Sequence, residues 1–591
     1  MTPNTDTSRL SLWLVLLSVP AFALVLLDLQ WGQKLSIDEF EFFRASRWIA
    51  EGRVPYRDFW EHHLPLQWVL FAPVAALVES PGAEAILAMR WAQLPLWIAV
   101  MAGLMAIMKR AGMDLTQRAI AVLLLVTSTA FVRPALEFRV DTAGNLGYIG
   151  ALALVLIRPS SRPAWISFGA IMSAAVLANM RLAPLVVATA ALLMFADARE
   201  RHWRFRAVTL WMIVGVAAVA VVFAIYVVAS GAVNGFVDGM RANIFFEQAT
   251  ADAEGTLSSI LLAPVTRFDP AGIALLLAGL AGVLIALREI RRPGPEQVIA
   301  LLAILSLAAV VRLSIHYPYH LQTTQLLLAI TAASILRPAA YRLALLMVGL
   351  FILASAAMRI EPAFGKALAY QDVIMREVDR RTGASEQVFD GVGVALHRQP
   401  AYRYWFLPAA VRLLALRGLV EPYDAPQMAA APPAAVVHSY RVHRWLQMFP
   451  SLASYTTHHY IPLYRDLWIP APNALLEPGG RARWLVPRNG RYRLMSSQLM
   501  AKHPWFRDPL RYAETTKDAA VFEVPLAQLP PGDAAPAELF VNGSPASSAV
   551  VLLRRGDRVE VRSMARVPVA VFLLPEDVTR LFMSPVDEVV W

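Results

Sequence analysis

The segment "KLSIDEFEFFRASRWIAEGRVPYRDFWEHHLPLQWVLFAPV", residues 34–74, directly follows an apolar run at residues 10–30. It combines acids, arginines, paired histidines and aromatic side chains, which a plain connecting loop does not need. Its first part, Ser-Ile-Asp-Glu, has the Ser-x-x-Glu form of a capping box, in which Glu39 reaches back to the amide of Ser36. The segment therefore predicts a helix that begins after Ser36 and ends at Gly52.

The predicted helix is amphipathic. Charged side chains share one face and apolar side chains another, at Glu41, Arg44, Arg47 and Glu51 and at Phe42, Ala45, Trp48 and Ile49 respectively. Since Trp and Phe are on its apolar side, we expect the helix to lie along a membrane interface.

The two acids at its start differ. Glu39 has a capping duty, whereas Asp38 has none and lies in the first turn, where the helix dipole favours the ionised carboxylate. Asp38 could bind a sugar hydroxyl, a metal or another cation, or act as a general base. The alternative is that it only stabilises the helix dipole.

The rest of the segment turns at two prolines, Pro55 and Pro65. Arg57 and Asp58 are predicted to pair. His62 and His63 are adjacent, so on a helix or strand they would point in different directions and at most one would face a site.

Composition indicates a membrane protein. The chain has 591 residues, is 57% hydrophobic and has no cysteine, which excludes disulfides and thiol chemistry. The formal charge of +10 is weak evidence for nucleic acid, and we expect no nucleic-acid partner. About eleven transmembrane helices are predicted, at about residues 10–30, 84–108, 118–133, 142–158, 164–179, 182–197, 207–230, 269–287, 297–313, 318–336 and 340–359.

Positive charge sets the predicted topology. The apolar segment 64–79 is not counted as crossing, because the Arg- and Lys-rich short loops then all face the cytoplasm, together with the N-terminus. The outer face receives the first loop 31–83, the loops 134–141, 231–268 and 312–317, and everything after residue 360. We expect residues 1–360 to form the membrane domain, 361–480 a mixed α/β region and 481–591 a β-rich, sandwich-like domain with turns at Asn542-Gly543 and Gly556-Asp557.

Ionisable residues of the other outer loops complete a candidate site. Asp141 begins a helix with small residues behind it, and ionisable residues at membrane depth are functional candidates. Arg is suited to phosphate through its planar fork. His316 and His320 have an i,i+4 metal spacing, although Pro318 lies between them. The residues on this face are Glu137, Arg139 and Asp141, then Arg241, then Arg312, His316, Tyr317 and His320.

Three motifs together resemble the GT-C superfamily of membrane glycosyltransferases. They are Gly52, Pro55, Tyr56, Asp58, Phe59, His63 and Pro65 in the first loop, Arg139 and Asp141 in "EFRVD", and Arg312, His316, Tyr317 and His320 in "RLSIHYPYHLQ". The nearest branch resembles the dolichyl-phosphate-mannose protein mannosyltransferases and the aminoarabinose transferase of lipid A. The resemblance covers about residues 10–360 and implies a polytopic all-α catalytic domain that carries the extracytoplasmic α/β and β-rich regions.

The resemblance implies transfer of a hexosyl or pentosyl group from a polyprenyl-phosphate donor to a glycan, lipid or protein acceptor, with inversion. It makes Asp38 the catalytic residue of the first loop. We expect Glu39 and Asp141 beside it in catalysis, Arg241, Arg312, His316 and Tyr317 at the donor phosphate, and Tyr56, Asp58, His62, His63, Glu137, Arg139 and His320 at the substrates. No residue is assigned to a metal, and a divalent cation, Mg²⁺ or Mn²⁺, stays open. The expected location is the inner membrane of a bacterium, with the C-terminal domain periplasmic or extracellular and the oligomeric state undetermined.

Two other functions remain open. A transporter or flippase predicts broken helices and charges at mid-span. A non-catalytic scaffold with a glycan-binding outer domain predicts that Asp38 can be replaced without consequence.

Overall fold

The computed structural model describes residues 32–157, 161–201, 205–249, 269–288, 294–313, 317–357, 366–464, 466–498, 500–502, 522–525, 536–548, 550–578 and 580–583. The predicted span at 10–30 and His316 lie outside these residues. The chain divides into two compact units, one of Met1–Glu79 with Glu84–Lys366 and one of Ser80–Ala83 with Ala367–Trp591.

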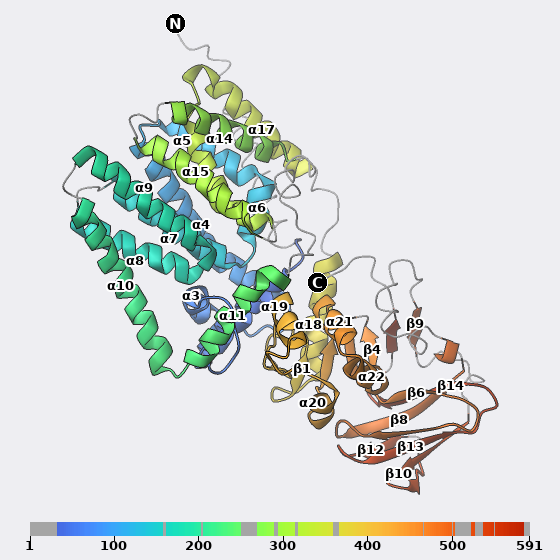
Figure 1. The fold of residues 1–591 in the computed structure, drawn as a ribbon. Helices are drawn as coiled ribbons and strands as arrows, with labels where there is room; N and C mark the ends of the chain where they lie inside the picture. Colours follow the sequence, from blue (N-terminus) through green and yellow to red (C-terminus); the bar gives the residue numbers. More distant parts are fainter. Residues whose placement is uncertain are drawn as a thin grey trace. The chain divides into compact units, whose positions relative to one another are not determined.

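The first unit is helical (Figure 1). Its described α-helices are α2 (Ile37–Ala50), α3 (Leu66–Ala76), α4 (Glu84–Arg110), α5 (Leu115–Thr127), α6 (Thr129–Leu136), α7 (Val140–Ile157), α8 (Arg162–Ala178), α9 (Ala183–Arg201), α10 (Phe205–Ala229), α11 (Val233–Ala249), α14 (Pro270–Arg288), α15 (Pro295–Val311), α16 (Gln322–Ser334) and α17 (Tyr341–Ala357). Three short 3₁₀ helices join them: η1 (Met180–Leu182), η2 (Pro318–Leu321) and η3 (Pro338–Ala340).

This unit has the composition of a multi-pass membrane protein. Among the described residues, four helices are long and apolar enough to cross a membrane: Glu84–Arg110, Val140–Ile157, Ala207–Ala229 and Pro270–Arg288. Two bent pairs, α5 with α6 at 69° and Pro318–Ser334 with Pro338–Leu353 at 107°, raise the number to six.

Every predicted span within the described residues is helical. However, fewer than the expected eleven or so of these helices are both long and apolar enough to cross a membrane. Arg162–Ala178, Met180–Met194 and Pro295–Val311 are shorter apolar helices, below the roughly 20 residues that a bilayer requires. The 11-residue α3 is also short and contains Pro73. At about 1.5 Å per residue it is roughly half as long as a bilayer core is thick, in agreement with the prediction that 64–79 does not cross.

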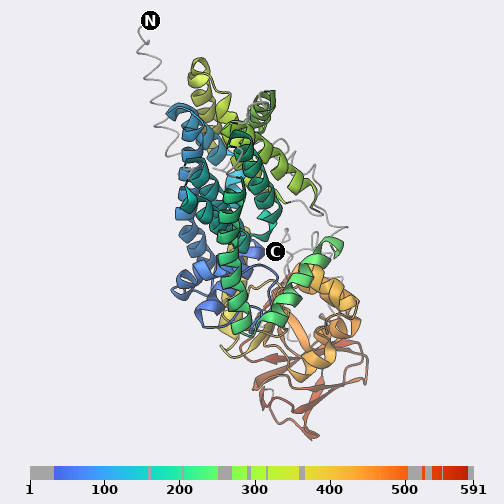
Figure 2. The ribbon, with the colours of Figure 1, turned by 60° about the vertical axis from the view of Figure 1, so that its left-hand side comes forward.

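Close helix packing depends on glycine. A Cβ on Gly169 of α8 would lie 2.2 Å from the carbonyl oxygen of Met212, and one on Gly215 of α10 would lie 2.0 Å from that of Ile166. The two helices lie side by side in both ribbon views (Figures 1 and 2). Small residues let helix backbones approach this closely inside membranes.

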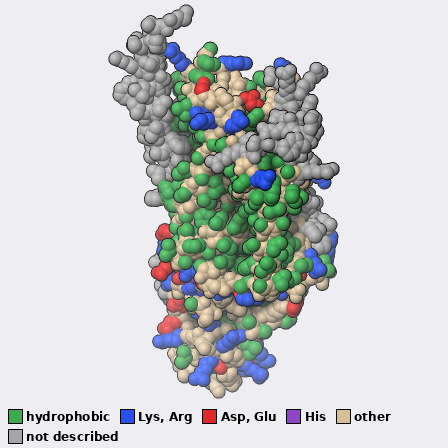
Figure 3. Space-filling model, turned by 90° about the vertical axis from the view of Figure 1, so that its left-hand side faces the viewer, with side chains coloured by type: hydrophobic (Ala, Val, Ile, Leu, Met, Phe, Trp, Pro, Cys, Tyr) green, Lys and Arg blue, Asp and Glu red, His purple; other side chains and the backbone are tan. Residues whose placement is uncertain are grey.

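Hydrophobic side chains form a broad band over one face of the helical unit (Figure 3). On α10 the exposed residues include Ile213, Val222, Ile225 and Val228, which are 57–68% exposed. Such a continuous apolar surface is unfavourable in water and suits contact with lipid.

The second unit begins with α18 (Lys366–Arg381) and a five-stranded mixed sheet of order β2-β1-β3-β5-β4. The strands are β1 (Gln387–Phe389), β2 (Gln399–Pro400), β3 (Ala435–Val437), β4 (Tyr460–Tyr464) and β5 (Leu467–Pro470). β1 pairs parallel to β2 and β3, and β5 pairs antiparallel to β3 and β4. Its helices are α19 (Ala409–Leu416), α20 (Ala425–Ala430), α21 (Tyr440–Met448) and α22 (Pro450–His459).

Two antiparallel four-stranded sheets follow, of order β11-β10-β13-β7 and β12-β8-β14-β6. Their strands are β6 (Asn473–Leu476), β7 (Arg481–Leu485), β8 (Gly490–Ser497), β10 (Ala537–Val541), β11 (Ser544–Pro545), β12 (Val550–Leu553), β13 (Arg558–Ser563) and β14 (Val569–Pro575). β9 (Phe522–Pro525) pairs with β15 (Arg580–Met583), and η4 (Met500–Lys502) is a short 3₁₀ turn.

The two larger sheets share one core, which includes Trp484, Tyr492, Val561 and Leu573. The predicted turns are present, since Asn542, Gly543 and Gly556 have φ of +51°, +87° and +90°. The mixed α/β character and the β-sheet character expected after residue 360 are therefore confirmed.

Candidate active site

Helix α2 begins as its sequence predicts. The backbone N–H of Ser36 donates to Oε2 of Glu39 at 2.8 Å. Glu51 caps its other end, and Gly52 follows with φ of +83°. The start of this helix determines where its acidic side chains point.

Glu39 is completely buried and fully engaged. Arg90 of α4 donates to both of its oxygens, through Nε and Nη2, at 2.7 Å each. The backbone N–H of Phe138 donates to Oε1 at 2.8 Å. With Ser36 this gives Glu39 four hydrogen bonds, so its role in this structure is to join α2 to α4 and to the loop before α7.

Asp38 points to a different set of partners. Its Oδ2 lies 2.8 Å from Nη1 of Arg139, and its side chain is 22% exposed. Arg139 also pairs with Glu137 at 3.4 Å and with Asp141 at 3.2 Å. We call these four residues, Asp38, Glu137, Arg139 and Asp141, the Arg139 cluster; the structure brings together residues that the sequence assigned to two separate outer loops.

Aromatic and amide groups hold this cluster in place. The guanidinium carbon of Arg139 lies 3.5 Å from the ring centroid of Tyr319, in cation–π geometry. Asn179, just before η1, donates to Oδ1 of Asp141 at 2.9 Å. Arg139 is therefore fixed from both sides while the Asp38 carboxylate stays partly accessible.

Two pKa shifts characterise the cluster. Burial of Arg139 opposes its charge, but the carboxylates around it, Asp38 first among them, raise its pKa well above the usual range. Burial also raises the pKa of Glu137 to about 7, against the opposing effect of Arg139. Glu137 can therefore hold or release a proton near neutral pH, as an acid–base group must.

Arg181 is an additional cation at this site. Its guanidinium carbon lies 5.4 Å from the ring centroid of Tyr319, on which Arg139 also lies. Its Nη1 is buried and has no hydrogen-bond partner among the described residues. A buried guanidinium N–H without an acceptor is costly, so this atom is suited to donate a hydrogen bond to an anionic group of a ligand.

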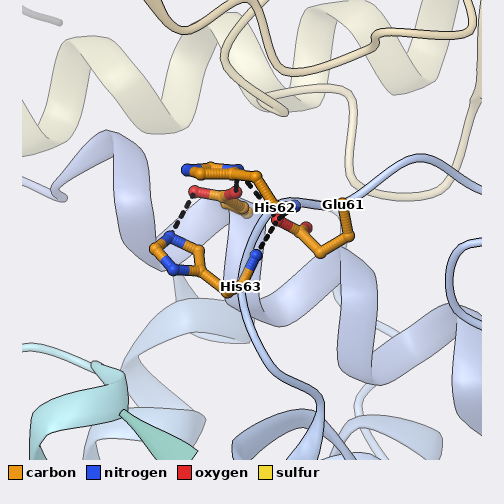
Figure 4. A group of neighbouring side chains, drawn as sticks. Glu61, His62 and His63 are labelled. Carbon is orange, nitrogen blue, oxygen red and sulfur yellow. Dashed lines mark hydrogen bonds and ion pairs between the residues drawn. The ribbon is translucent and has the colours of Figure 1, made fainter. Parts of the chain in front are cut away.

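A second group of ionisable residues lies farther along α2 and in the loop that follows it. Glu41, Glu61, His62 and His63 each offer a ligand atom, these atoms lie within 4.8 Å of one another, and the group could hold a metal ion. We call these four residues the histidine cluster; Figure 4 shows the side chains of Glu61, His62 and His63 close to one another. The two histidines do not point in different directions as on a helix or strand, because residues 61–64 form neither and both rings face Glu41.

The predicted amphipathic face of α2 is also corrected here. Glu41 and Arg44, predicted to lie on the charged face of the helix, are each 1% exposed. Only the end of the helix carries an exposed ion pair, between Arg47 and Glu51. The periodicity was right, but it could not reveal that the charged face packs inside the protein.

Two other first-loop residues have structural contacts. Arg57 and Asp58 pair at 2.8 Å, as predicted, and Asp58 also accepts the backbone N–H of Val54 at 2.7 Å. Tyr56 is buried, has φ of +68°, and donates its hydroxyl to the carbonyl of His63 at 2.6 Å. These contacts shape the loop that carries the histidine cluster.

Two of the residues expected at the donor phosphate, Arg241 and Arg312, have no contact with the Arg139 cluster among the described residues. Arg241 is exposed on α11 and lies 3.8 Å from Asp238. Arg312 follows α15 as its exposed C-cap. Tyr317 is 41% exposed and, with His320, packs against Tyr319, through which both adjoin the cluster.

Sequence reasoning missed Glu61, Arg90, Arg181 and Asn179. A signal existed for Arg181, because Asn179-Met-Arg-Leu interrupts two apolar runs, and charge inside such a run is functional by default. Arg90 offered the same signal within its own apolar run.

No protein-family model matches the chain, and no curated protein matches it. Solved structures do: the chain is structurally similar to glycosyltransferases of the GT-C fold. ArnT from Cupriavidus metallidurans in the apo state has a TM-score of 0.53 at 13% identity, over 77% of this chain and 97% of the ArnT chain.

Two further structures are similar at lower scores. ArnT from the same organism bound to undecaprenyl phosphate has a TM-score of 0.47 at 15% identity, over 80% of this chain and 96% of that chain. The Archaeoglobus fulgidus oligosaccharyltransferase in complex with Zn and sulfate has a TM-score of 0.45 at 12% identity, over 78% and 72%. At these identities the likeness concerns the fold alone.

Proposed function

We propose that the chain is an integral membrane glycosyltransferase that transfers a sugar from a polyprenyl-phosphate donor to a hydroxyl-bearing acceptor. The observation that carries the proposal is the Asp38–Arg139 ion pair at the start of α2. It leaves a carboxylate 22% exposed beside two further acids, within a fold similar to that of GT-C enzymes.

The proposed reaction is a single displacement at the anomeric carbon. The acceptor oxygen forms a bond to this carbon while the bond to the phosphate oxygen breaks, so the configuration inverts and polyprenyl phosphate leaves. Asp38 takes the hydroxyl proton, and Arg139 holds its carboxylate in position. Ion pairs with Glu137 and Asp141 hold Arg139 in place. Glu137 can then receive the proton from Asp38, because the pKa of Glu137 is raised to about 7.

We assign the donor phosphate to Arg181. Its buried Nη1 lacks an acceptor among the described residues, and guanidinium groups bind phosphate through charge-assisted hydrogen bonds. ArnT, whose apo structure shares the fold, has also been solved with undecaprenyl phosphate. We propose a role at the lipid entrance, rather than at the reacting phosphate, for Arg241, Arg312, His316 and Tyr317.

The remaining parts of the proposal concern topology. We place about eleven spans in a bacterial inner membrane, with the N-terminus cytoplasmic and the part after residue 360 outside. The catalytic domain would be 1–360, and 361–480 and 481–591 would serve acceptor recognition. The sugar and the acceptor, whether glycan, lipid or protein, are left open.

A transporter or flippase is the second candidate. The 69° bend between α5 and α6 favours it, because transporters use broken helices. Against it, the ionisable residues of the Arg139 cluster lie together at the start of α2 and around the start of α7.

The decisive experiment uses the full-length protein in proteoliposomes with polyprenyl-phosphate sugars as donors. Wild type should release polyprenyl phosphate and transfer the sugar. Asp38→Asn should lose transfer, while Glu51→Gln, which alters the exposed acid at the C-cap of the same helix, should retain it. Full transfer by Asp38→Asn would refute the assignment of the base. Movement of intact donor across the membrane without cleavage would establish the flippase instead.

A further inference from the structure

The structure assigns a binding site for a divalent transition metal of the Zn²⁺ class to the histidine cluster, formed by Glu41 of α2 and by Glu61, His62 and His63 of the following loop. This inference rests on the geometry of these residues and not on the proposed glycosyl transfer.

The distances within the cluster match those of metal ligands. Zn–N and Zn–O bonds are about 2.0–2.1 Å, so two ligand atoms of a tetrahedral site are about 3.3 Å apart. Nδ1 of His62 lies 3.3 Å from Oε1 of Glu41 and 3.1 Å from Oε1 of Glu61. Nε2 of His63 lies 4.0 Å from Oε2 of Glu41, which a small rotation of either side chain would shorten. Two carboxylates and two imidazoles can therefore surround one ion.

Burial and charge favour an ion at this position. The side chains of Glu41 and Glu61 are 1% and 0% exposed. Oε2 of Glu61 has no hydrogen-bond partner among the described residues. Nδ1 of His62 faces both carboxylates but carries at most one proton, so it can donate to only one of them. Because two buried carboxylates are costly without compensating charge, a dication would stabilise both at once.

The alternative source of positive charge is the protein itself. Arg44 is buried one turn farther along α2, and a protonated His62 would add a second charge. In that case the cluster would be a network of ion pairs with no affinity for metal. The two alternatives differ in a direct binding measurement.

The ligand set indicates which metal would bind. Imidazole nitrogen suits Zn²⁺ and other late first-row dications, whereas Mg²⁺ and Ca²⁺ prefer all-oxygen sites. This differs from the Mg²⁺ or Mn²⁺ that the sequence left open. The 15% exposure of the His63 side chain leaves one side of the cluster reachable from outside.

The surroundings hold the ligands in place, as outer contacts do at established metal sites. The His62 ring stacks on Trp60, with centroids 5.4 Å apart and planes at 12°. Nδ2 of Asn243 on α11 donates to the carbonyl of His62 at 2.5 Å. Oε1 of Glu61 accepts the N–H of His62 at 2.8 Å, which orients its other oxygen. A bound ion would join α2 to this loop.

The test measures metal binding by the full-length protein, purified without a polyhistidine tag and treated with a chelator. We expect about one equivalent of Zn²⁺ to bind in competition with a chromogenic chelator, tighter than Mg²⁺, and to raise the Tm. Co²⁺ in its place should give the visible absorption of a low-coordinate site. Glu61→Gln and His62→Gln should each weaken Zn²⁺ binding by at least about tenfold.

Two control variants, and a comparison of stability with and without Zn²⁺, separate metal binding by the histidine cluster from other effects. Glu51→Gln and His458→Gln, an exposed acid and an exposed histidine, should bind Zn²⁺ as wild type does. Without metal, Glu61→Gln should be at least as stable as wild type, because it removes a buried charge; only with Zn²⁺ should wild type exceed it. Binding that both cluster variants retain, or no binding by wild type, would overturn the proposal in favour of the ion-pair network.

Discussion

Asp38 and Glu39 are neighbours in the sequence, yet the structure predicts that replacing them separates stability from activity. Glu39→Gln removes the carboxylate that pairs with the buried guanidinium of Arg90 at 2.7 Å, and places an amide N–H₂ where an oxygen accepted hydrogen bonds. Breaking a buried ion pair costs about 3–5 kcal/mol. At about 1 °C per kcal/mol for a chain of this size, the Tm should fall by about 3–5 °C.

Asp38→Asn should behave in the opposite way. The side chain is 22% exposed, its amide oxygen can still accept from Arg139, and Arg139 keeps Glu137 and Asp141. We expect a loss of about 1–2 kcal/mol, which lowers the Tm by about 1–2 °C. Sugar transfer, by contrast, should fall by about 10²–10⁴-fold because the general base is gone.

The assay pairs two measurements on the same preparations in detergent: thermal unfolding, and turnover with a polyprenyl-phosphate sugar well below the Tm of every variant. Glu51→Gln is the matched control, since its exposed pair with Arg47 is worth at most about 0.5 kcal/mol. An unchanged Tm for Glu39→Gln would refute the structural role of the buried pair. An Asp38→Asn variant that loses as much Tm as Glu39→Gln would show that Asp38 is structural too.

Three further predictions concern the surroundings of α2. Arg181→Ala should raise the KM for the donor by about 10–100-fold and change kcat less, because it removes a charge-assisted contact to phosphate; an unchanged KM would refute this. The pKa of Glu137 is raised to about 7 in the folded protein, whereas in the unfolded chain it is about 4.5. Between these pH values the folded protein holds a proton that the unfolded chain has lost, so stability falls as the pH rises from about 4.5 to about 7. Glu137→Gln should therefore raise the Tm at pH 8 and leave it nearly unchanged at pH 4.5, and equal shifts at both pH values would contradict the burial effect. Gly239→Ala would place a Cβ 2.1 Å from the carbonyl oxygen of Glu61, whereas Gly150 has no atom within 4 Å of such a Cβ. We expect the first substitution to cost about 1–3 kcal/mol and the second to be neutral, both measured by thermal unfolding.

Local sequence signals predicted local structure well. The Ser-x-x-Glu pattern identified the start of α2 and the role of Glu39, and Gly52 identified its end. The pair of Arg57 and Asp58 was also predictable, since adjacent opposite charges need no tertiary information. These features depend on residues a few positions apart, whose geometry the helix or turn already determines.

Long-range partners were not predictable in the same way. Arg90 and Glu39 are 51 residues apart, and nothing in either segment names the other. The burial of Glu41 and Arg44 was missed for the same reason, because periodicity tells which residues share a face but not what covers it. Among the described residues, length and composition identify four to six candidate spans, because several of the predicted apolar runs form helices of 17 residues or fewer.

The position of α2 along its axis links the two clusters. Asp38 and Glu41 are three residues apart and so are near neighbours on the helix surface, whereas Glu39 is turned by about 100° toward Arg90. A shift of the helix start by one residue would rotate every side chain by that angle and would remove Asp38 from Arg139 and Glu41 from the histidines together. The hydrogen bond between Ser36 and Glu39, worth only about 1 kcal/mol by itself, therefore matters chiefly because it sets this register. The buried pair of Glu39 with Arg90 fixes the same register from the side. The structural carboxylate of Glu39 thus helps to position Asp38, the neighbouring residue that we propose to act in catalysis.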